Sequence, residues 1–165
     1  MATQQEQVVK VLLIEDDPEI VESLSLAFQV RCPEANLVST YLGREGIELA
    51  SSEAPDVIIL DLGLPDVSGF EVLRQIRLFS TVPIIILTAT SDESYMVRAL
   101  EWGADDYVVK PFKPPEFLVR VKSLAGGESQ PPRSGEPAVP DDRKYGSKEL
   151  DDPPAGGSVE SAKTR

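Results

Sequence analysis

Four short apolar segments of this chain each end in a charged or hydroxyl-bearing residue, and this pattern constrains the fold more than any other feature. The segments are 11–14 before Glu15-Asp16-Asp17, 57–60 before Asp61, 84–87 before Thr88, and 107–109 before Lys110. Continuous apolar runs of this length are typical of strands buried on both faces of a parallel sheet. Open α/β sheets bind ligands at the carboxyl ends of such strands. Together the four ends predict a site for a phosphate group and a hard cation.

Helical patterns alternate with these strands. After Asp17, a candidate cap, and Pro18, apolar residues recur at helical spacing. The predicted strands are 10–14, 36–41, 57–61, 84–88 and 106–110. The predicted helices are 18–30, 44–52, one capped by Ser68 and running past Ile76, 92–102 ending at Gly103, and one after 114–115 that extends to about 124. Five strand-then-helix units predict an α/β fold with a parallel sheet and helices on both faces.

The composition excludes several classes of function. The chain has 165 residues, a net charge of −12, no histidine and one cysteine. A surface this acidic repels phosphate backbones, so we expect no direct nucleic-acid binding. Cys32 alone can form neither an internal disulfide nor a cysteine-based metal site, and we interpret it as a bystander thiol. No secretion signal and no apolar stretch of membrane-spanning length are present, so we expect a cytoplasmic location without membrane association.

The composition changes after Ala125. Residues 126–165 contain 6 Pro and 6 Gly with hardly any large apolar side chains. Such a segment cannot bury enough apolar surface to offset the entropy lost on ordering. We therefore predict a flexible N-terminus over residues 1–8, one folded domain over 9–125, and a disordered tail or truncated linker over 126–165.

Asp61 is the candidate nucleophile of an aspartyl-phosphate reaction. Such a reaction needs a cation near the transferring phosphoryl group and donors for its oxygens. Mg²⁺ prefers oxygen ligands and usually takes one or two carboxylates plus water. Asp16 and Asp61 could supply the carboxylates, Glu15 could act through a water, and the backbone carbonyl of Gly63 is a further candidate ligand.

Thr88 and Lys110 are the candidate phosphate contacts, through a hydroxyl and a compact positive charge. Each residue alone has an ordinary explanation. An aspartate at a strand end is more often structural, a threonine there usually makes turn contacts, and a lysine before proline is usually solvated. The predicted sheet favours the functional interpretation, because it places all of these residues at the same edge.

These residues, in this order and spacing, resemble the receiver domain of two-component response regulators over about residues 9–124. The resemblance rests on four motifs: 13–17 (LIEDD), 61–69 (DLGLPDVSG), 87–89 (LTA) and 103–112 (GADDYVVKPF). It implies a flavodoxin-like, doubly wound (βα)5 sheet of strand order 2-1-3-4-5. It also implies that Asp61 accepts phosphate from a histidine kinase, that Glu15 and Asp16 hold Mg²⁺, and that Thr88 and Lys110 contact the phosphoryl group.

The resemblance has further implications for switching. Tyr107 would turn inward when Thr88 is drawn to the phosphate, whereas the residues alone favour a half-buried strand aromatic. Family members commonly have a cis peptide bond before the proline at Pro111. The residues at the positions of Gly63 and Thr90 tune dephosphorylation in the family, and neither is suited to orient a water. We therefore expect a phosphorylated state of moderate to long lifetime.

The segment after 88 resembles receivers of the OmpR/PhoB type, which dimerise through the helix at 92–102, the strand at 106–110 and the following helix. Their cross-subunit ion pairs can be formed here by two pairs of residues: Asp106 with Arg120, and Glu101 with Lys122. A third pair is lost, because Met96 stands where a basic residue is usual opposite Glu116. The ordinary interpretation is a solvated charged face, since exposed pairs contribute only about 0–1 kcal/mol.

Regulators of that type continue into a winged-helix DNA-binding domain, and residues 145–151 faintly resemble its first strand. A truncated longer regulator and a single-domain regulator with a tail both stay open. The leading hypothesis is a phosphoacceptor that is not an enzyme acting on a separate substrate. The main alternative is a pseudo-receiver that binds partners without phosphorylation. A phosphatase would need an aspartate at Gly63, and a flavin protein would need a hydroxyl- and glycine-rich loop where Glu15 stands.

Overall fold

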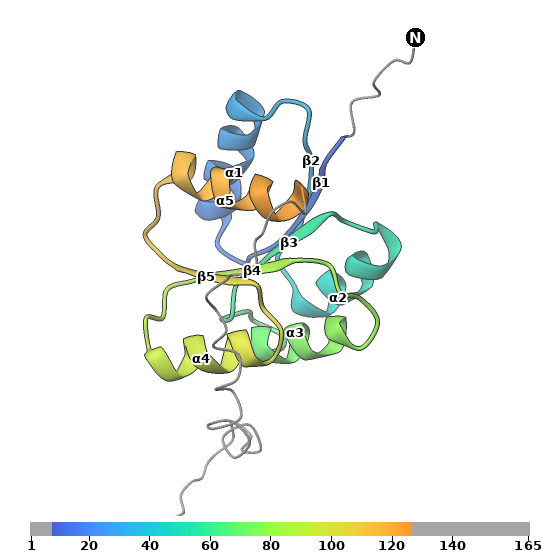
Figure 1. Cartoon of the computed structure of the whole chain (residues 1–165), viewed down its shortest axis with the longest axis vertical. Helices are drawn as coiled ribbons and strands as arrows, with labels where there is room; N and C mark the ends of the chain where they lie inside the picture. Colours follow the sequence, from blue (N-terminus) through green and yellow to red (C-terminus); the bar gives the residue numbers. More distant parts are fainter. Residues whose placement is uncertain (1–7, 127–165) are drawn as a thin grey trace, which may run out of the picture. The chain divides into compact units, whose positions relative to one another are not determined.

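Five parallel strands form one sheet in the order β2-β1-β3-β4-β5 in the computed structural model, which describes residues 8–126 (Figure 1). The strands are β1 Lys10–Ile14, β2 Asn36–Thr40, β3 Val57–Leu60, β4 Ile84–Thr88 and β5 Asp106–Val109. The helices are α1 Pro18–Arg31, α2 Gly43–Ser52, α3 Gly69–Arg77, α4 Glu93–Glu101 and α5 Pro114–Gly126. The predicted fold class and strand order are confirmed. The predictions for residues 1–7 and 127–165 lie outside the described residues.

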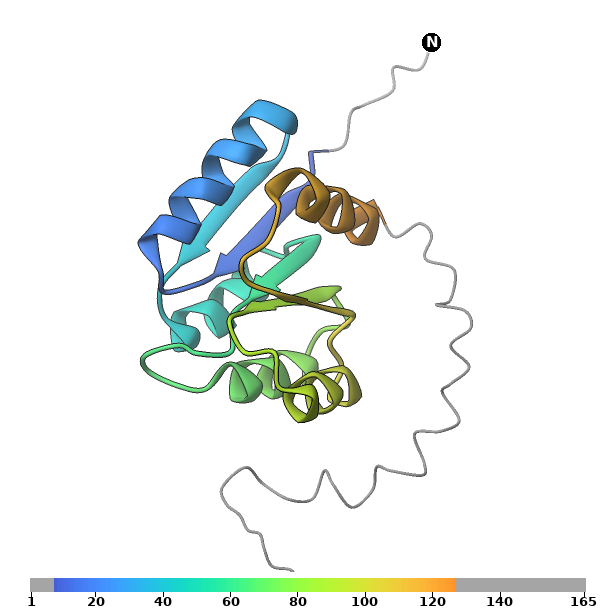
Figure 2. The same ribbon diagram turned by 90° about the vertical axis from the view of Figure 1, so that its left-hand side faces the viewer.

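Helices cover both faces of the sheet because strand side chains alternate between the faces. Figures 1 and 2 show α1 and α5 on one face and α2, α3 and α4 on the other. Leu12, Ile58 and Ile86 pack toward α2, α3 and α4, whereas Val11, Ile59 and Leu87 pack toward α1 and α5. No helix in residues 8–126 is long and apolar enough to cross a membrane.

Two helices begin at the capping residues that the sequence predicted, and one ends just before the predicted glycine. Asp17 accepts a hydrogen bond from the N–H of Glu19 (2.9 Å) at the start of α1, and Ser68 accepts one from the N–H of Phe70 (3.0 Å) at the start of α3. Gly103 follows α4 with φ +115°, a left-handed backbone angle that glycine adopts without steric cost.

Three strands end earlier than predicted: β2 at Thr40, β3 at Leu60 and β5 at Val109. At β3 the reason is local. The N–H of Asp61 still bonds to the carbonyl of Ile14 (3.0 Å), but the N–H of Gly63 turns back to the Asp61 carboxylate (3.2 Å). The polar residues Asp61 and Lys110 therefore lie just beyond the ladder, at the sheet edge, rather than within it.

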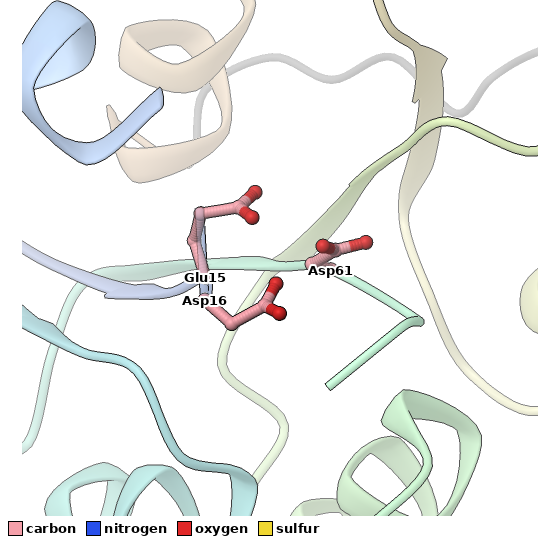
Figure 3. A group of neighbouring side chains, drawn as sticks. All are labelled: Glu15, Asp16 and Asp61. Carbon is pink, nitrogen blue, oxygen red and sulfur yellow. The ribbon is translucent and has the colours of Figure 1, made fainter. Parts of the chain in front are cut away.

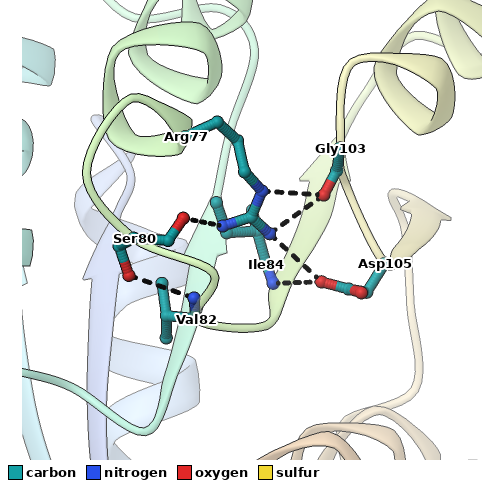
Figure 4. Close-up of polar contacts among 6 residues, drawn as sticks. All are labelled: Arg77, Ser80, Val82, Ile84, Gly103 and Asp105. Atoms are coloured by element: carbon teal, nitrogen blue, oxygen red, sulfur yellow. Dashed lines mark hydrogen bonds and ion pairs between the residues drawn. The ribbon is translucent and has the colours of Figure 1, made fainter.

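At the opposite edge of the sheet, Arg77 ties the end of α3 to the segment between α4 and β5 (Figure 4). Its Nε and Nη2 donate to the carbonyl of Gly103 (3.1 and 2.9 Å), and Nη1 donates to the carbonyl of Ser80 (3.0 Å). Nη2 also contacts Asp105 (3.3 Å), whose carboxylate accepts the N–H of Ile84 (2.9 Å). A planar guanidinium suits several fixed acceptors, so this contact holds α3, β4 and the α4–β5 segment together.

Candidate metal and phosphate site

The carboxyl ends of β1 and β3 bring three carboxylates together (Figure 3). Ile14 pairs with Leu60 in the parallel ladder, so Glu15 and Asp16 follow β1 beside Asp61, which follows β3. One oxygen from each of the three side chains lies within 4.8 Å of the others. Glu15 is 1% and Asp61 6% exposed. Adjacent parallel strands thus place two carboxylates, Glu15 and Asp61, where water has little access, whereas Asp16 is not buried.

Lys110 provides the positive charge at this cluster. Its Nζ lies 2.9 Å from Oε1 of Glu15 and 3.4 Å from Oδ2 of Asp61. Its backbone N–H bonds to the carbonyl of Thr88 (2.8 Å), which places it beyond β5 and next to β4. The Lys110–Pro111 peptide bond is cis, as the resemblance implied. The lysine ammonium therefore bridges the two buried carboxylates.

The pKa values of Glu15 and Lys110 are both raised, but for different reasons. Burial raises the pKa of Glu15 from 4.5 to about 7, and the charge on Asp61 adds to this, while Lys110 opposes it. Burial alone would lower the pKa of Lys110, but its hydrogen bond to Glu15 and the charge on Asp61 raise it overall. Lys110 therefore stays charged at neutral pH, and the site carries an excess of carboxylate.

The metal-free protein is expected to lose stability as the pH rises through the folded-state pKa of Glu15. Because that pKa, about 7, lies above the ordinary 4.5, the folded state keeps a proton that the unfolded state releases. This stabilisation is fully present below about pH 4.5 and is lost above about pH 7. Relative to Glu15→Gln, the free energy of unfolding should fall by roughly 3 kcal/mol between about pH 4.5 and pH 8.

Urea unfolding of both proteins in a chelator, at steps across this range, checks the pH dependence. The glutamine variant serves as the control, since it keeps the shape of Glu15 and cannot titrate. If the free energy of unfolding changes with pH in the same way for both proteins, the pKa of Glu15 is not raised and the prediction is wrong.

The oxygen set fits Mg²⁺ by its chemistry. Mg²⁺ takes hard oxygen ligands and uses few carboxylates, with water completing the octahedron. Two buried carboxylates sharing one lysine leave charge that a divalent cation can offset. The N–H of Gly63 donates to Oδ1 of Asp61 at 3.2 Å, which orients that carboxylate at the cluster. Glu15, Asp16 and Asp61 are the residues that would hold the ion.

The predicted phosphate and switch residues flank the cluster on β4 and β5. Thr88 ends β4 and is 4% exposed, paired in the ladder with Val109. Tyr107 lies on β5 and is buried against the core on the α4 side, and its hydroxyl donates to the carbonyl of Thr90 (3.0 Å). Tyr107 is thus more deeply buried than the half-buried aromatic that the residues alone favoured. The switching roles of Thr88 and Tyr107 stay predictions.

The four predicted dimer-face residues lie on α4, β5 and α5, but one predicted pair also forms within the chain. Arg120 contacts the carboxylate of Asp106 at 3.0 and 3.1 Å in the same subunit. Glu101 ends α4, and Lys122 is exposed on α5. Cross-subunit pairing of Asp106 would therefore have to replace or share an existing contact, and it stays a prediction.

Two contacts of the described residues escaped the sequence reasoning. The carboxylate of Asp66 caps α2 from 23 residues away, and no local spacing indicates such a partner. On α4, the guanidinium of Arg98 lies 4.9 Å above the ring of Phe70 and close to Tyr95 and Trp102. Tyr95 and Trp102 stand three and four residues from Arg98, and this helical spacing could have indicated their part of the cluster.

Comparisons with known proteins identify the family of the chain. The sequence-family model described as the response regulator receiver domain matches residues 11–122 of this chain. KdpE of Mycobacterium tuberculosis (strain ATCC 25618 / H37Rv), described as a transcriptional regulatory protein, is 46% identical over 113 residues, which are 68% of this chain and 49% of KdpE. The chain thus spans about half the length of this curated relative.

Solved structures of receiver domains share the fold of this chain. DrrB of Thermotoga maritima, described as an OmpR/PhoB homolog, is 34% identical with a TM-score of 0.66, covering 75% of this chain and 55% of DrrB. The receiver domain of the sensor histidine kinase PA1611 from Pseudomonas aeruginosa is 28% identical with a TM-score of 0.65, covering 73% and 99%. It holds a magnesium ion in its active-site cleft. The chain therefore belongs to the response regulator receiver-domain family and is similar to members of its OmpR/PhoB type such as DrrB.

Proposed function

We propose that this chain accepts a phosphoryl group on Asp61 from a histidine kinase in a reaction that depends on Mg²⁺. The observation that carries the proposal is the Lys110 ammonium between the buried carboxylates of Glu15 and Asp61. A lysine at this point places a positive charge beside the nucleophile Asp61 and can contact a phosphate oxygen after transfer. The family match supports the same chemistry.

The reaction is an in-line transfer. A carboxylate oxygen of Asp61 attacks the phosphorus, and the bond from phosphorus to the imidazole nitrogen of the donor histidine breaks, with its electron pair left on that nitrogen. Lys110 and the hydroxyl of Thr88 hold oxygens of the transferred group. Glu15, Asp16 and Asp61 would hold Mg²⁺, which would supply positive charge beside the transferred group. The chain acts on no separate substrate and only promotes its own phosphorylation and dephosphorylation.

The output is a change in the surface of α4, β5 and α5, with a second copy of this chain as the partner. Four large hydrophobic side chains of α4 and α5 are exposed: Tyr95, Val97, Leu100 and Val119, at 39%, 40%, 42% and 67%. Acidic Glu101 and Asp106 and basic Arg120 and Lys122 lie on α4, β5 and α5, so two copies related by a twofold axis can pair opposite charges. Added phosphate charge that draws Thr88 toward Asp61 would bias this surface through Tyr107.

The setting proposed for this function is a cytoplasmic two-component system that regulates transcription. The description of KdpE as a transcriptional regulatory protein supports that output. The chain itself would signal through protein contacts rather than by binding nucleic acid, since its net charge is −12.

Acetyl phosphate provides the direct test, because it can donate without a kinase. The full chain is incubated with Mg²⁺ and acetyl phosphate, and intact mass and light-scattering size are measured. We expect one phosphoryl adduct that a chelator prevents, together with a shift from monomer toward dimer. An adduct without any size change would remove the dimer from the proposal. No adduct with acetyl phosphate or any histidine kinase would favour a phosphorylation-independent interaction module.

A further inference from the structure

Helix α2 begins without a capping side chain of its own. Leu42 occupies its N-cap position and offers no side-chain acceptor. The carboxylate of Asp66 takes that role instead, accepting the N–H of Gly43 at 2.7 Å and of Arg44 at 3.0 Å. Both hydrogen bonds are charge-assisted and point at the positive end of the helix. The first turn of α2 is therefore completed by the loop between β3 and α3.

That loop starts at Asp61 and is anchored near both ends. The N–H of Gly63 bonds to the Asp61 carboxylate (3.2 Å), and the N–H of Gly69 bonds to the carbonyl of Leu62 (2.9 Å). The middle of the loop, residues 64–67, is held from outside by the start of α2. Asp66 supplies the polar part of this contact.

Close packing supplies the apolar part of the same contact. A β-carbon added to Gly43 would lie 2.8 Å from Cγ1 of Val67 and 3.2 Å from Cδ1 of Leu64. Only a residue without a β-carbon lets the loop approach α2 this closely. Residues 64 and 67, on either side of Asp66, thus both pack closely against the start of α2.

We propose that Asp66 is a positioning residue for the metal and phosphate site: by binding the first turn of α2 it holds the loop that carries Asp61 and Gly63 in the arrangement that binds Mg²⁺. This inference rests on the proposed function, because it concerns the same site. Groups outside the ligand set that orient the ligands commonly change metal affinity by about 10- to 100-fold. Asp66 acts through the loop and touches neither metal nor phosphate.

The backbone N–H groups, rather than the Arg44 side chain, carry this contact. Nε of Arg44 is 4.0 Å from Asp66, and that side chain is 74% exposed. Exposed pairs of this kind contribute little. The hydrogen bonds from the backbone N–H groups of Arg44 and Gly43 hold the pKa of Asp66 below its usual value, so the cap stays charged at neutral pH.

The test compares Mg²⁺ affinity among matched variants of the full chain without a phosphodonor. Amide signals are followed by NMR as MgCl₂ is added. Asp66→Ala removes the anchor, and Asp66→Asn keeps one acceptor oxygen in case the alanine variant folds poorly. Asp56→Ala is the control, because it removes a carboxylate that accepts a backbone N–H (Lys10, 2.8 Å) from an exposed position on another loop. Arg44→Ala removes only the side chain.

We expect Asp66→Ala to weaken Mg²⁺ binding by about 10-fold, the low end of that range, because Asp66 acts through the loop rather than on a ligand. The affinity of Asp66→Asn should lie between those of Asp66→Ala and the wild type. Asp56→Ala and Arg44→Ala should stay within about twofold of wild type. Adduct formation from acetyl phosphate at low Mg²⁺ should slow in the same order and recover at high Mg²⁺. A merely structural cap would lower the unfolding midpoint without this recovery pattern.

Two outcomes distinguish a failure of the positioning role of Asp66 from a failure of the proposed phosphoacceptor function. If the wild type binds Mg²⁺ and forms the adduct while Asp66→Ala has the affinity of Asp56→Ala, the positioning role is overturned and the proposed function stands. If the wild type neither binds Mg²⁺ nor forms the adduct, both are overturned together.

Discussion

Asp61→Asn is expected to abolish the phosphoryl adduct that the wild type forms with Mg²⁺ and acetyl phosphate. The amide has no anionic oxygen to attack phosphorus, although it keeps the shape of the carboxylate. The adduct should fall below detection by intact mass, while thermal unfolding still shows a cooperative transition. Asp56→Asn, a matched change on an exposed aspartate that follows α2, should form the adduct at the wild-type rate. An adduct on Asp61→Asn at that rate would exclude Asp61 as the acceptor.

Gly69→Ala is expected to lower the free energy of unfolding by about 3 kcal/mol, because it forces backbone atoms apart. A β-carbon at Gly69 would lie 2.3 Å from the carbonyl oxygen of Asp61 and 2.5 Å from Cα of Leu62. No rotamer change can relieve a clash with backbone. The loop after Asp61 would have to shift, so Mg²⁺ binding should weaken as well.

Gly63→Ala is the control for this effect, since no heavy atom lies within 4 Å of its added β-carbon. Its free energy of unfolding should stay within about 0.5 kcal/mol of wild type. Urea titrations of the three proteins measure both values. Equal losses for Gly69→Ala and Gly63→Ala would show that the close approach at Gly69 is relieved without cost.

The local parts of the fold were predictable because their signals are local. Asp17 and Ser68 cap the helices that follow them, and Gly103, where the helix was predicted to end, follows α4 with a positive φ. Apolar runs of three or four residues placed four of the strands, and the strand predicted at 36–41 had only the apolar pair Leu37-Val38 before Tyr41. All five predicted strands agree with the structure to within one residue at each end. The strand order came only from the family resemblance, since periodicity shows that a strand is buried but not which strands are its neighbours.

The parts that escaped prediction depend on partners far apart in the sequence. Asp66 caps a helix 23 residues earlier, and Arg77 binds Gly103 and Asp105 across 26 and 28 residues. Neither contact leaves a spacing that local reasoning can detect. Asp66 accepts from backbone N–H groups, and Arg77 donates to a backbone carbonyl and to a carboxylate. Only the folded chain brings these partners close.

The residues of the candidate site were predictable from the sequence, but their electrostatics were not. The residues were predicted from strand ends, and the structure brings Glu15, Asp16, Asp61 and Lys110 together. Their electrostatics required burial to be known. Glu15 is almost inaccessible to water, and this burial raises its pKa to about 7. The sequence placed Glu15 at the site but gave no sign of this shift. Metal binding and proton release are therefore expected to be coupled at this residue.

The most direct test is to identify the residue that carries the phosphoryl group. The phosphorylated chain is reduced with borohydride, which converts an acyl phosphate on aspartate to homoserine, and the peptides are sequenced by mass spectrometry. We expect homoserine at position 61 in samples that received both Mg²⁺ and acetyl phosphate, and aspartate there when either is omitted. Homoserine at another aspartate, or aspartate at position 61 in a chain that carries the adduct, would contradict the assignment of Asp61 as phosphoacceptor.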